Sequence, residues 1–227
     1  IDQLFAILGM AQETMASLLQ TGISLTYTFL RSYFAKDRKL LKTADGVFVK
    51  TPQQRILLER YYLYPDARIH TVPYGIEIGD LSPKDKSEKL RNELKIPEGT
   101  AVVISVSDMT EFGEMSYFLR AFQKLTIKKP HTWALIVGYG PLFKEIEFEM
   151  LSLALGSRVL MVGAVSSARL LELICLADVL VNLSSRTTEF ETTLLEAMAQ
   201  KKIIIASELN PLATIVDDGR DGFLVRP

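Results

Sequence analysis

The chain has 227 residues, of which 48% are hydrophobic and 23% are charged, and its 26 basic residues nearly balance its 27 acidic ones. This length is enough to bury one large hydrophobic core or two smaller ones. A formal net charge of -1 gives no reason to expect nucleic acid as a partner. With Cys175 as its single cysteine, the chain can form neither an intrachain disulfide nor a cysteine-based metal cluster, which fits a reducing compartment.

The two ends of the chain carry no recognisable targeting signal. The sequence from Ile1 has no basic leader, no short apolar core and no small-residue cleavage site, so we expect no secretory signal peptide. Ile1 lies within a helical pattern, and the terminal GFLVRP ends a strand-like run. We therefore expect both ends to fall inside a longer fold.

Two segments near the start raise the question of a membrane. Residues 14–30 carry no charge, but polar residues interrupt them, and a spanning helix needs about 20 mainly apolar residues. We favour a buried helix of a larger domain over a transmembrane helix. Residues 29–42 have a basic face and an apolar face. This pattern favours a solvated helix that covers a core, and the alternative is a helix lying on an anionic membrane surface. The apolar face comprises Phe29, Leu30, Tyr33, Phe34, Leu40 and Leu41.

From residue 45 onward, apolar strand-like runs alternate with helical segments. The runs are residues 45–51, 69–75, 101–108, 132–140, 159–165, 178–184 and 202–209. Helices are expected at residues 52–63, within 80–96, near 114–127, near 142–155, near 167–176 and from about 191. Apolar runs followed by helices indicate parallel strands covered on both faces. We therefore predict an α/β fold with a doubly wound, Rossmann-like parallel sheet and right-handed crossovers.

In such a sheet, ligands bind beyond the carboxyl ends of the strands, so we looked for chemistry in the loops that follow the strands. The loop GYGP, residues 138–141, is a G-x-G turn that enters a helix, where free backbone N–H groups can face a phosphate. It lacks the third glycine of the dinucleotide fingerprint and follows a late strand. An equally good interpretation is a tight turn with Pro141 at the first helical position.

Seven segments taken together are more specific than any single loop. They are VPYGIE (72–77), SVSDMTEFGEMSYFLRAFQKL (105–125), ALIVGYGP (134–141), VLMVGAV (159–165), LADVLVNLSS (176–185), EFETTLLEAMA (189–199) and IVDDGRDGFLVRP (215–227). Their order and spacing resembles the C-terminal half of the retaining glycosyltransferases of the GT-B fold, family four (glycosyl transferases group 1). The resemblance implies that residues 1–78 end an incomplete N-terminal, acceptor-side domain, and that residues 79–227 form the C-terminal nucleotide-sugar-binding domain.

The resemblance also implies a donor site. In the family, a glutamate at the second position of an E-x7-E motif bonds the ribose hydroxyls of the nucleotide sugar, and Glu196 occupies this position. An ionised carboxylate is a good bidentate acceptor for a vicinal diol. The alternative for Glu196 is a helix-surface acid near Lys201 and Lys202. The donor-binding residues that the resemblance implies are Gly138, Gly140, Gly163, Val165, Arg186, Phe190, Glu191, Thr192 and Glu196.

The first glutamate of the E-x7-E motif, which would touch the donor sugar, is replaced by Thr188. The run T-E-F-E predicts a capping box, in which Thr188 caps the following helix and Glu191 reaches back to its N–H. Glu189 lies one residue after the motif position, and it is our candidate for the catalytic carboxylate. The resemblance implies no metal and no cofactor, because the nucleotide-diphosphate sugar enters as the donor substrate.

Other family positions differ in charge. Where the family has an arginine and a lysine that neutralise the diphosphate, this chain has Asp108 and Phe112. Hydrogen bonds to charged groups contribute roughly 1.5 to 3 kcal/mol each, so losing two predicts donor binding weaker by about a hundredfold to ten-thousandfold. Arg186 is our candidate for a replacement cation, because a guanidinium grips phosphate oxygens bidentately. The late glycine-rich loop of the family also differs. Asn210 and Pro211 stand where small residues are common, and Thr214 stands in the place of an acid.

Two classes of function follow. The first is a glycosyltransferase that moves a sugar from a nucleotide sugar to a carbohydrate or lipid-linked acceptor, in cell-surface polysaccharide or glycolipid synthesis. The second is a degenerate GT-B subunit that binds or stabilises a partner glycosyltransferase. A dinucleotide-dependent oxidoreductase ranks far lower, because the early G-x-G-x-x-G is missing. We assign no catalytic role to His70, His131 or Cys175. The expected location is cytoplasmic, with peripheral contact to the inner face of the membrane as an alternative.

Overall fold

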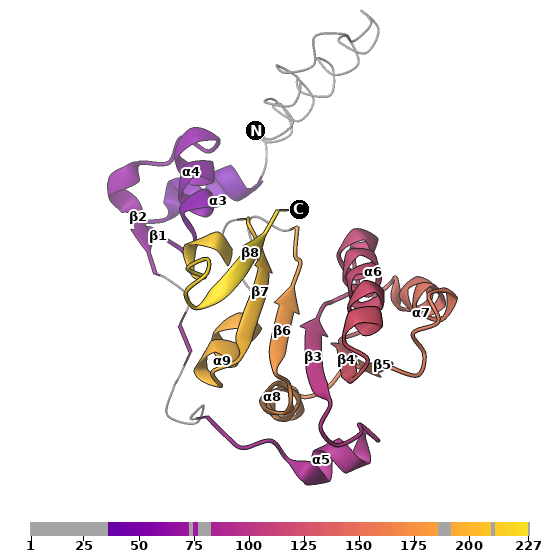
Figure 1. The fold of residues 1–227 in the computed structure, drawn as a ribbon. Coiled ribbons are helices and arrows are strands. Elements are labelled where there is room, and N and C mark those ends of the chain that lie inside the picture. Colours follow the sequence, from indigo (N-terminus) through magenta and orange to yellow (C-terminus); the bar gives the residue numbers. More distant parts are fainter. Residues whose placement is uncertain (1–35, 73–74, 77–82, 186–191, 210–211, 227) are drawn as a thin grey trace, which may run out of the picture. The chain divides into compact units, whose positions relative to one another are not determined.

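The computed structural model describes residues 36–72, 75–76, 83–185, 192–209 and 212–226 (Figure 1). The chain divides into two compact units, residues 1–72 and residues 73–227. The expectation that the first unit ends an acceptor-side domain stays a prediction. Among the described residues, no helix is long and apolar enough to cross a membrane. Residues 14–30, on which the membrane question turned, lie outside the described part.

The first unit contains a small strand-helix-strand motif. Its elements are α3 (Lys36–Thr43), β1 (Val47–Val49), α4 (Pro52–Arg60), the 3-10 helix η1 (Asp66–Arg68) and β2 (Ile69–Thr71). The strands β1 and β2 pair in parallel. Helix α4 begins as predicted, because Pro52 needs no hydrogen-bond partner for its nitrogen and the hydroxyl of Thr51 accepts a bond of 3.3 Å from the N–H of Gln54.

A small core holds this motif together. Val49, Tyr64 and Ile69 are buried in it, and half-buried Leu41 packs against them. Leu40, which we placed on the same apolar face, is 68% exposed, so that part of the prediction is wrong. Adjacent helical residues point about 100° apart, and in α3 it is Leu41 that faces this core.

The second unit is built on a six-stranded sheet in which every pairing is parallel. The strands are β3 (Ala101–Val106), β4 (Thr132–Val137), β5 (Val159–Gly163), β6 (Val179–Asn182), β7 (Ile203–Ser207) and β8 (Gly222–Val225). They lie in the order β5-β4-β3-β6-β7-β8 (Figure 1). The chain builds outward from β3 to β5, returns, and builds outward again from β6 to β8. This order reverses between β3 and β6 and confirms the doubly wound prediction.

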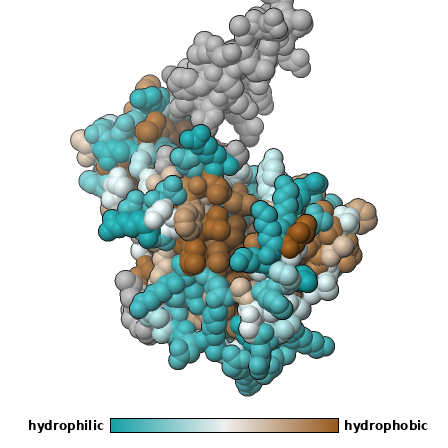
Figure 2. Space-filling view, viewed as in Figure 1, coloured by the Kyte–Doolittle hydropathy of each residue, from teal (hydrophilic) through white to brown (hydrophobic). Residues whose placement is uncertain are grey.

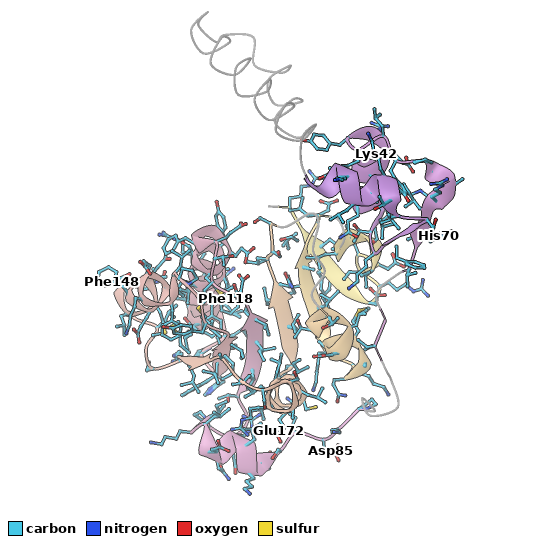
Figure 3. All side chains as sticks on the ribbon, turned by 180° about the vertical axis from the view of Figure 1, so that it is seen from behind. Lys42, His70, Asp85, Phe118, Phe148 and Glu172 are labelled. Atoms are coloured by element: carbon cyan, nitrogen blue, oxygen red, sulfur yellow. The ribbon has the colours of Figure 1, made fainter. Side chains whose placement is uncertain are left out.

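Helices cover both faces of this sheet. They are α5 (Glu88–Glu93), α6 (Phe112–Lys128), α7 (Phe143–Ser152), α8 (Ser167–Leu176), α9 (Thr193–Ala199) and the 3-10 helix η3 (Leu212–Thr214). One core contains Val102 and Ile104 of β3 with residues of α5, α8 and α9. The other contains Val103 of β3 with residues of α6 and α7, including the buried Phe118, whereas Phe148 of α7 is 74% exposed and points outward (Figure 3). The alternation along β3 is what a strand buried on both faces requires.

One part of the sheet face lies open. Between α6 and β8, side chains of β6 and β7 line an apolar groove of about 990 Å³, visible as a hydrophobic surface in Figure 2. The floor includes Val181, Leu183 and Ile205, and Tyr117 of α6 stands on its wall. The prediction of strands covered on both faces is therefore wrong for this face of β6 and β7, as far as the described residues go. Helices α6 and α7 follow β3 and β4 in the chain and cover their half of the sheet.

Candidate functional site

The reversal of strand order places two loops side by side at the carboxyl edge of the sheet. One follows β3 and runs from Ser107 to Glu111, and the other follows β6 from Leu183. Strands β3 and β6 are direct neighbours in the sheet, so their loops leave it at the same edge. In doubly wound folds this is where the crevice for a ligand forms.

The G-x-G turn after β4 packs tightly against the loop after β3. A Cβ on Gly138, whose φ is +126°, would lie 1.8 Å from the carbonyl oxygen of Ser107, and a Cβ on Gly140 would lie 1.8 Å from that of Asp108. The N–H of Gly138 also donates a bond of 2.9 Å to the carbonyl of Gly163. Close backbone approach alone thus requires both glycines, and their role in donor binding stays a prediction.

Replacing Gly138 with alanine is therefore expected to lower the free energy of unfolding by about 3 kcal/mol, because the methyl group has no room and the φ is unfavourable. Urea denaturation measures this change. Gly113→Ala is the matched control, since a Cβ there meets only an atom of Tyr117 at 3.8 Å. Equal stability of the two variants would contradict the packing argument.

Helix α7 begins later than the sequence suggested. Its first residue is Phe143, so Pro141 does not occupy the first helical position, and that prediction is wrong. The N–H of Leu142 donates a bond of 3.1 Å to the carbonyl of Met109 in the loop after β3. This bond fixes the turn before the helix can start. Gly163 has a φ of +80°, and the half-buried Val165 packs against the core beneath α8.

Glu196 lies in the first turn of α9, and its side chain is half-buried. Burial raises the pKa of its carboxyl, and no charge among the described residues offsets this effect. The nearby lysines do not pair with it: the Nζ of Lys202 donates to the carbonyl of Cys175 at 2.7 Å, and Lys201 lies exposed beyond the helix end. With no side chain of the described residues paired to it, this half-buried carboxylate is available to accept hydrogen bonds from a ligand.

The described part of α9 begins just after the predicted capping box. Thr192 is the N-cap, without a side-chain cap bond, and the first helical bond runs 3.0 Å from the N–H of Glu196 to the carbonyl of Thr192. Thr188 and Glu191 themselves lie outside the described residues, so the capping box stays a prediction. The remaining predicted residues, Arg186, Thr188, Glu189, Phe190 and Glu191, lie outside the described residues, as do Asn210 and Pro211.

The loop after β3 and the start of α6 carry three acids, Asp108, Glu111 and Glu114. Asp108 is exposed, and its Oδ1 accepts bonds from the N–H and the hydroxyl of Thr110 at 3.2 and 2.9 Å. Phe112 is 42% exposed. Glu111 and Glu114 both accept hydrogen bonds from Ser185, in the loop after β6. These two contacts were not predicted from the sequence. The sequence pattern that could have indicated them is an acidic residue on each side of the start of α6.

Two of the three residues set aside in the sequence, Cys175 and His131, lie toward the amino edge of the six-stranded sheet. Cys175 is buried in α8, and its Sγ donates 3.2 Å to the side-chain oxygen of Gln200, which confirms its place in the core. His70 is exposed in β2, and His131 is exposed before β4. Within the described ranges, no group of three or more metal-ligating side chains comes together.

The strand order is that of doubly wound α/β folds, which bind ligands, nucleotides among them, beyond the point where the order reverses. Residues 86–227 match the family described as "Glycosyl transferases group 1", so the chain belongs to this family. The match covers most of the second unit, and it confirms the resemblance and the GT-B fold that it implied.

Several known proteins are similar to this chain. It is 24% identical over 193 residues to alpha-D-kanosaminyltransferase of Streptomyces kanamyceticus, covering 84% of this chain and 50% of that one. It is 25% identical over 191 residues to alpha-monoglucosyldiacylglycerol synthase of Streptococcus pneumoniae, covering 82% and 43%. The crystal structure of Anabaena HepE in complex with UDP-glucose superposes with a TM-score of 0.70 at 21% identity, covering 86% and 55%. The chain spans about half the length of the curated relatives it matches.

Proposed function

We propose that this chain supplies the donor-binding half of a retaining glycosyltransferase, which transfers a sugar from a nucleotide-diphosphate sugar to an acceptor in polysaccharide or glycolipid synthesis. Membership of the family supports the reaction class. The names of the two relatives, a kanosaminyltransferase and a glucosyldiacylglycerol synthase, support a sugar donor and an acceptor that can be a lipid. The fold neighbour solved with UDP-glucose supports a nucleotide-diphosphate donor.

The observation that carries this proposal is the carboxylate of Glu196. It lies at the carboxyl edge of the sheet in the first turn of α9, half-buried and without a partner among the described residues. Two hydroxyls of a ribose would supply the donors that this acceptor lacks. The match to the second glutamate of the family motif points to the same role.

The reaction would break the bond between the anomeric carbon and the diphosphate oxygen and form a bond from that carbon to an acceptor hydroxyl oxygen, whose proton would pass to the departing diphosphate. Holding the two substrates in place and stabilising the charge on the departing diphosphate are the tasks left to the protein. We propose Glu189 as the carboxylate near the sugar and Arg186 as a cation near the diphosphate. Both assignments rest on the sequence alone, because the two residues lie outside the described part of the chain. Peripheral contact with a membrane through residues 29–42 belongs to the same proposal, because it would bring a lipid-linked acceptor to the site.

The alternative of a non-catalytic subunit has less support. Both relatives described above are named as a transferase or a synthase, and neither name indicates a silent partner. That alternative rests on Asp108, Phe112 and Thr188, which replace residues of the family site; of these, Asp108 and Phe112 have exposed side chains.

Calorimetric titration with uridine, guanosine and adenosine diphosphates and their sugars tests the proposal. We expect one of the three bases to be bound, and the matching nucleotide sugar to be consumed when acceptor is supplied. The departures at Asp108 and Phe112 predict dissociation constants above the micromolar range. No heat from any diphosphate at millimolar concentration would sink the proposed function.

A further inference from the structure

Ser185, in the loop after β6, donates hydrogen bonds to two carboxylates. The hydroxyl of Ser185 donates to Glu111 Oε2, and the backbone N–H of Ser185 donates to Glu114 Oε1 at 3.0 Å. The acids lie more than seventy residues earlier in the chain, just before and within the first turn of α6. Because one acceptor takes the side chain and the other takes the backbone, the two bonds fix both the position and the orientation of Ser185.

The residues just before Ser185 are fixed as well. Asn182, the last residue of β6, is buried, and its Oδ1 accepts a bond of 3.0 Å from the N–H of Ser184. Ser184 is also buried. The segment from Asn182 to Ser185 is thus tied to the end of its own strand on one side and to the start of α6 on the other.

Glu111 is exposed and Glu114 is half-buried, so neither acid is needed to fill a core. Carboxylates at the start of a helix are electrostatically favourable, and here they are also satisfied by Ser185. These negative charges oppose the binding of a diphosphate at the amino end of α6 in the wild-type chain.

We propose that Glu111 and Glu114 are positioning residues of the donor site, which act through Ser185 by holding the loop after β6 against the start of α6. This inference rests on the proposed function, because that loop borders the crevice in which the donor would bind. Neither acid touches the donor itself. Their effect is on the geometry of the opposite wall, and hence on affinity for the nucleotide.

The test compares four variants by two measurements, amide hydrogen exchange at Ser185 and affinity for uridine, guanosine and adenosine diphosphates. The double variant Glu111→Ala with Glu114→Ala removes both acceptors, and Ser185→Ala removes only the hydroxyl. Glu114→Gln keeps an amide oxygen as acceptor. Glu145→Ala is the matched control, because Glu145 is an exposed acid in the first turn of α7.

We expect the double variant to exchange the Ser185 amide about tenfold faster and to bind the diphosphate about tenfold more weakly, the scale of one hydrogen bond to a charged group. Glu114→Gln and Glu145→Ala should resemble the wild type in both measurements, and Ser185→Ala should fall between. Unchanged exchange in the double variant would overturn the inference whatever the nucleotide result. So would faster exchange with unchanged affinity. A wild-type protein that binds no diphosphate would instead refute the proposed function, and with it the role in donor binding.

Discussion

Replacing Glu196 with glutamine is expected to weaken binding of a nucleoside diphosphate by about tenfold to a hundredfold. A ribose diol has two donors for a carboxylate, whereas a glutamine side chain offers one neutral oxygen. Hydrogen bonds to charged groups contribute about 1.5 to 3 kcal/mol, and about 1.4 kcal/mol corresponds to a factor of ten. Isothermal titration with the diphosphate of the preferred base measures the change. The affinity for inorganic pyrophosphate, which has no ribose, should be unaffected.

The same substitution should act on stability in the opposite direction. Burial raises the pKa of Glu196, so the folded protein holds this proton more tightly than the unfolded chain does. A raised carboxyl pKa means that stability falls as pH rises from the unfolded value, about 4.3, through the folded one. Above that window the wild type buries a charge, and Glu196→Gln removes it. The variant should therefore unfold at a higher urea concentration than the wild type at pH 7, with the difference vanishing below pH 4.

An exposed acid supplies the control for both effects. Glu98 lies exposed in the turn before β3, and Glu98→Gln should change neither nucleotide affinity nor the pH dependence of unfolding. Binding that weakens while stability rises is the signature of a residue kept for function rather than for the fold. If Glu196→Gln lowers stability at pH 7, an unseen partner holds the carboxylate, and the ribose assignment is wrong.

The sheet could be predicted because its signal is local and repeated. Val102, Val103 and Ile104 are all apolar and pack alternately into the two cores, which is what a continuous apolar run indicates. The boundaries of α8 also came out correctly, since the hydroxyl of Ser166 caps it through the N–H of Arg169 at 3.3 Å. The doubly wound arrangement followed from the alternation of apolar runs with helices, whereas the order of the strands in the sheet was not predicted.

The parts that could not be predicted depend on contacts between distant segments. The bonds from Ser185 to Glu111 and Glu114 join residues 74 and 71 positions apart, and no periodic pattern marks such a pair. Helix α7 starts later than predicted because the carbonyl of Met109 accepts the N–H of Leu142. The two glycines of GYGP were interpreted as a phosphate loop or as a turn, while the backbone of Ser107 and Asp108 supplies the deciding reason. Local propensity carries no information on any of these contacts.

Restoring the two cations of the family is expected to tighten diphosphate binding by roughly a hundredfold. The double variant Asp108→Arg with Phe112→Lys removes a negative charge and adds two positive ones at the loop after β3, and two charge-assisted bonds of about 1.5 kcal/mol each give this factor. The structure allows both changes, because Asp108 is exposed and Phe112 is 42% exposed at the first position of α6. Neither substitution leaves a cavity in a core.

The change has a cost in stability that can be estimated in advance. Asp108→Arg removes the acceptor of the bonds from Thr110, and a lysine at a helix start opposes the helix dipole by about 0.3 to 1 kcal/mol. Asp108→Ala is the control, since it loses the same hydrogen bonds from Thr110 and removes the negative charge without adding a cation. If that control tightens binding as much as the double variant, repulsion by Asp108 was the whole effect. If the double variant binds no more tightly than the wild type, the diphosphate does not lie near the loop after β3, and the correspondence with the family fails at that wall of the crevice.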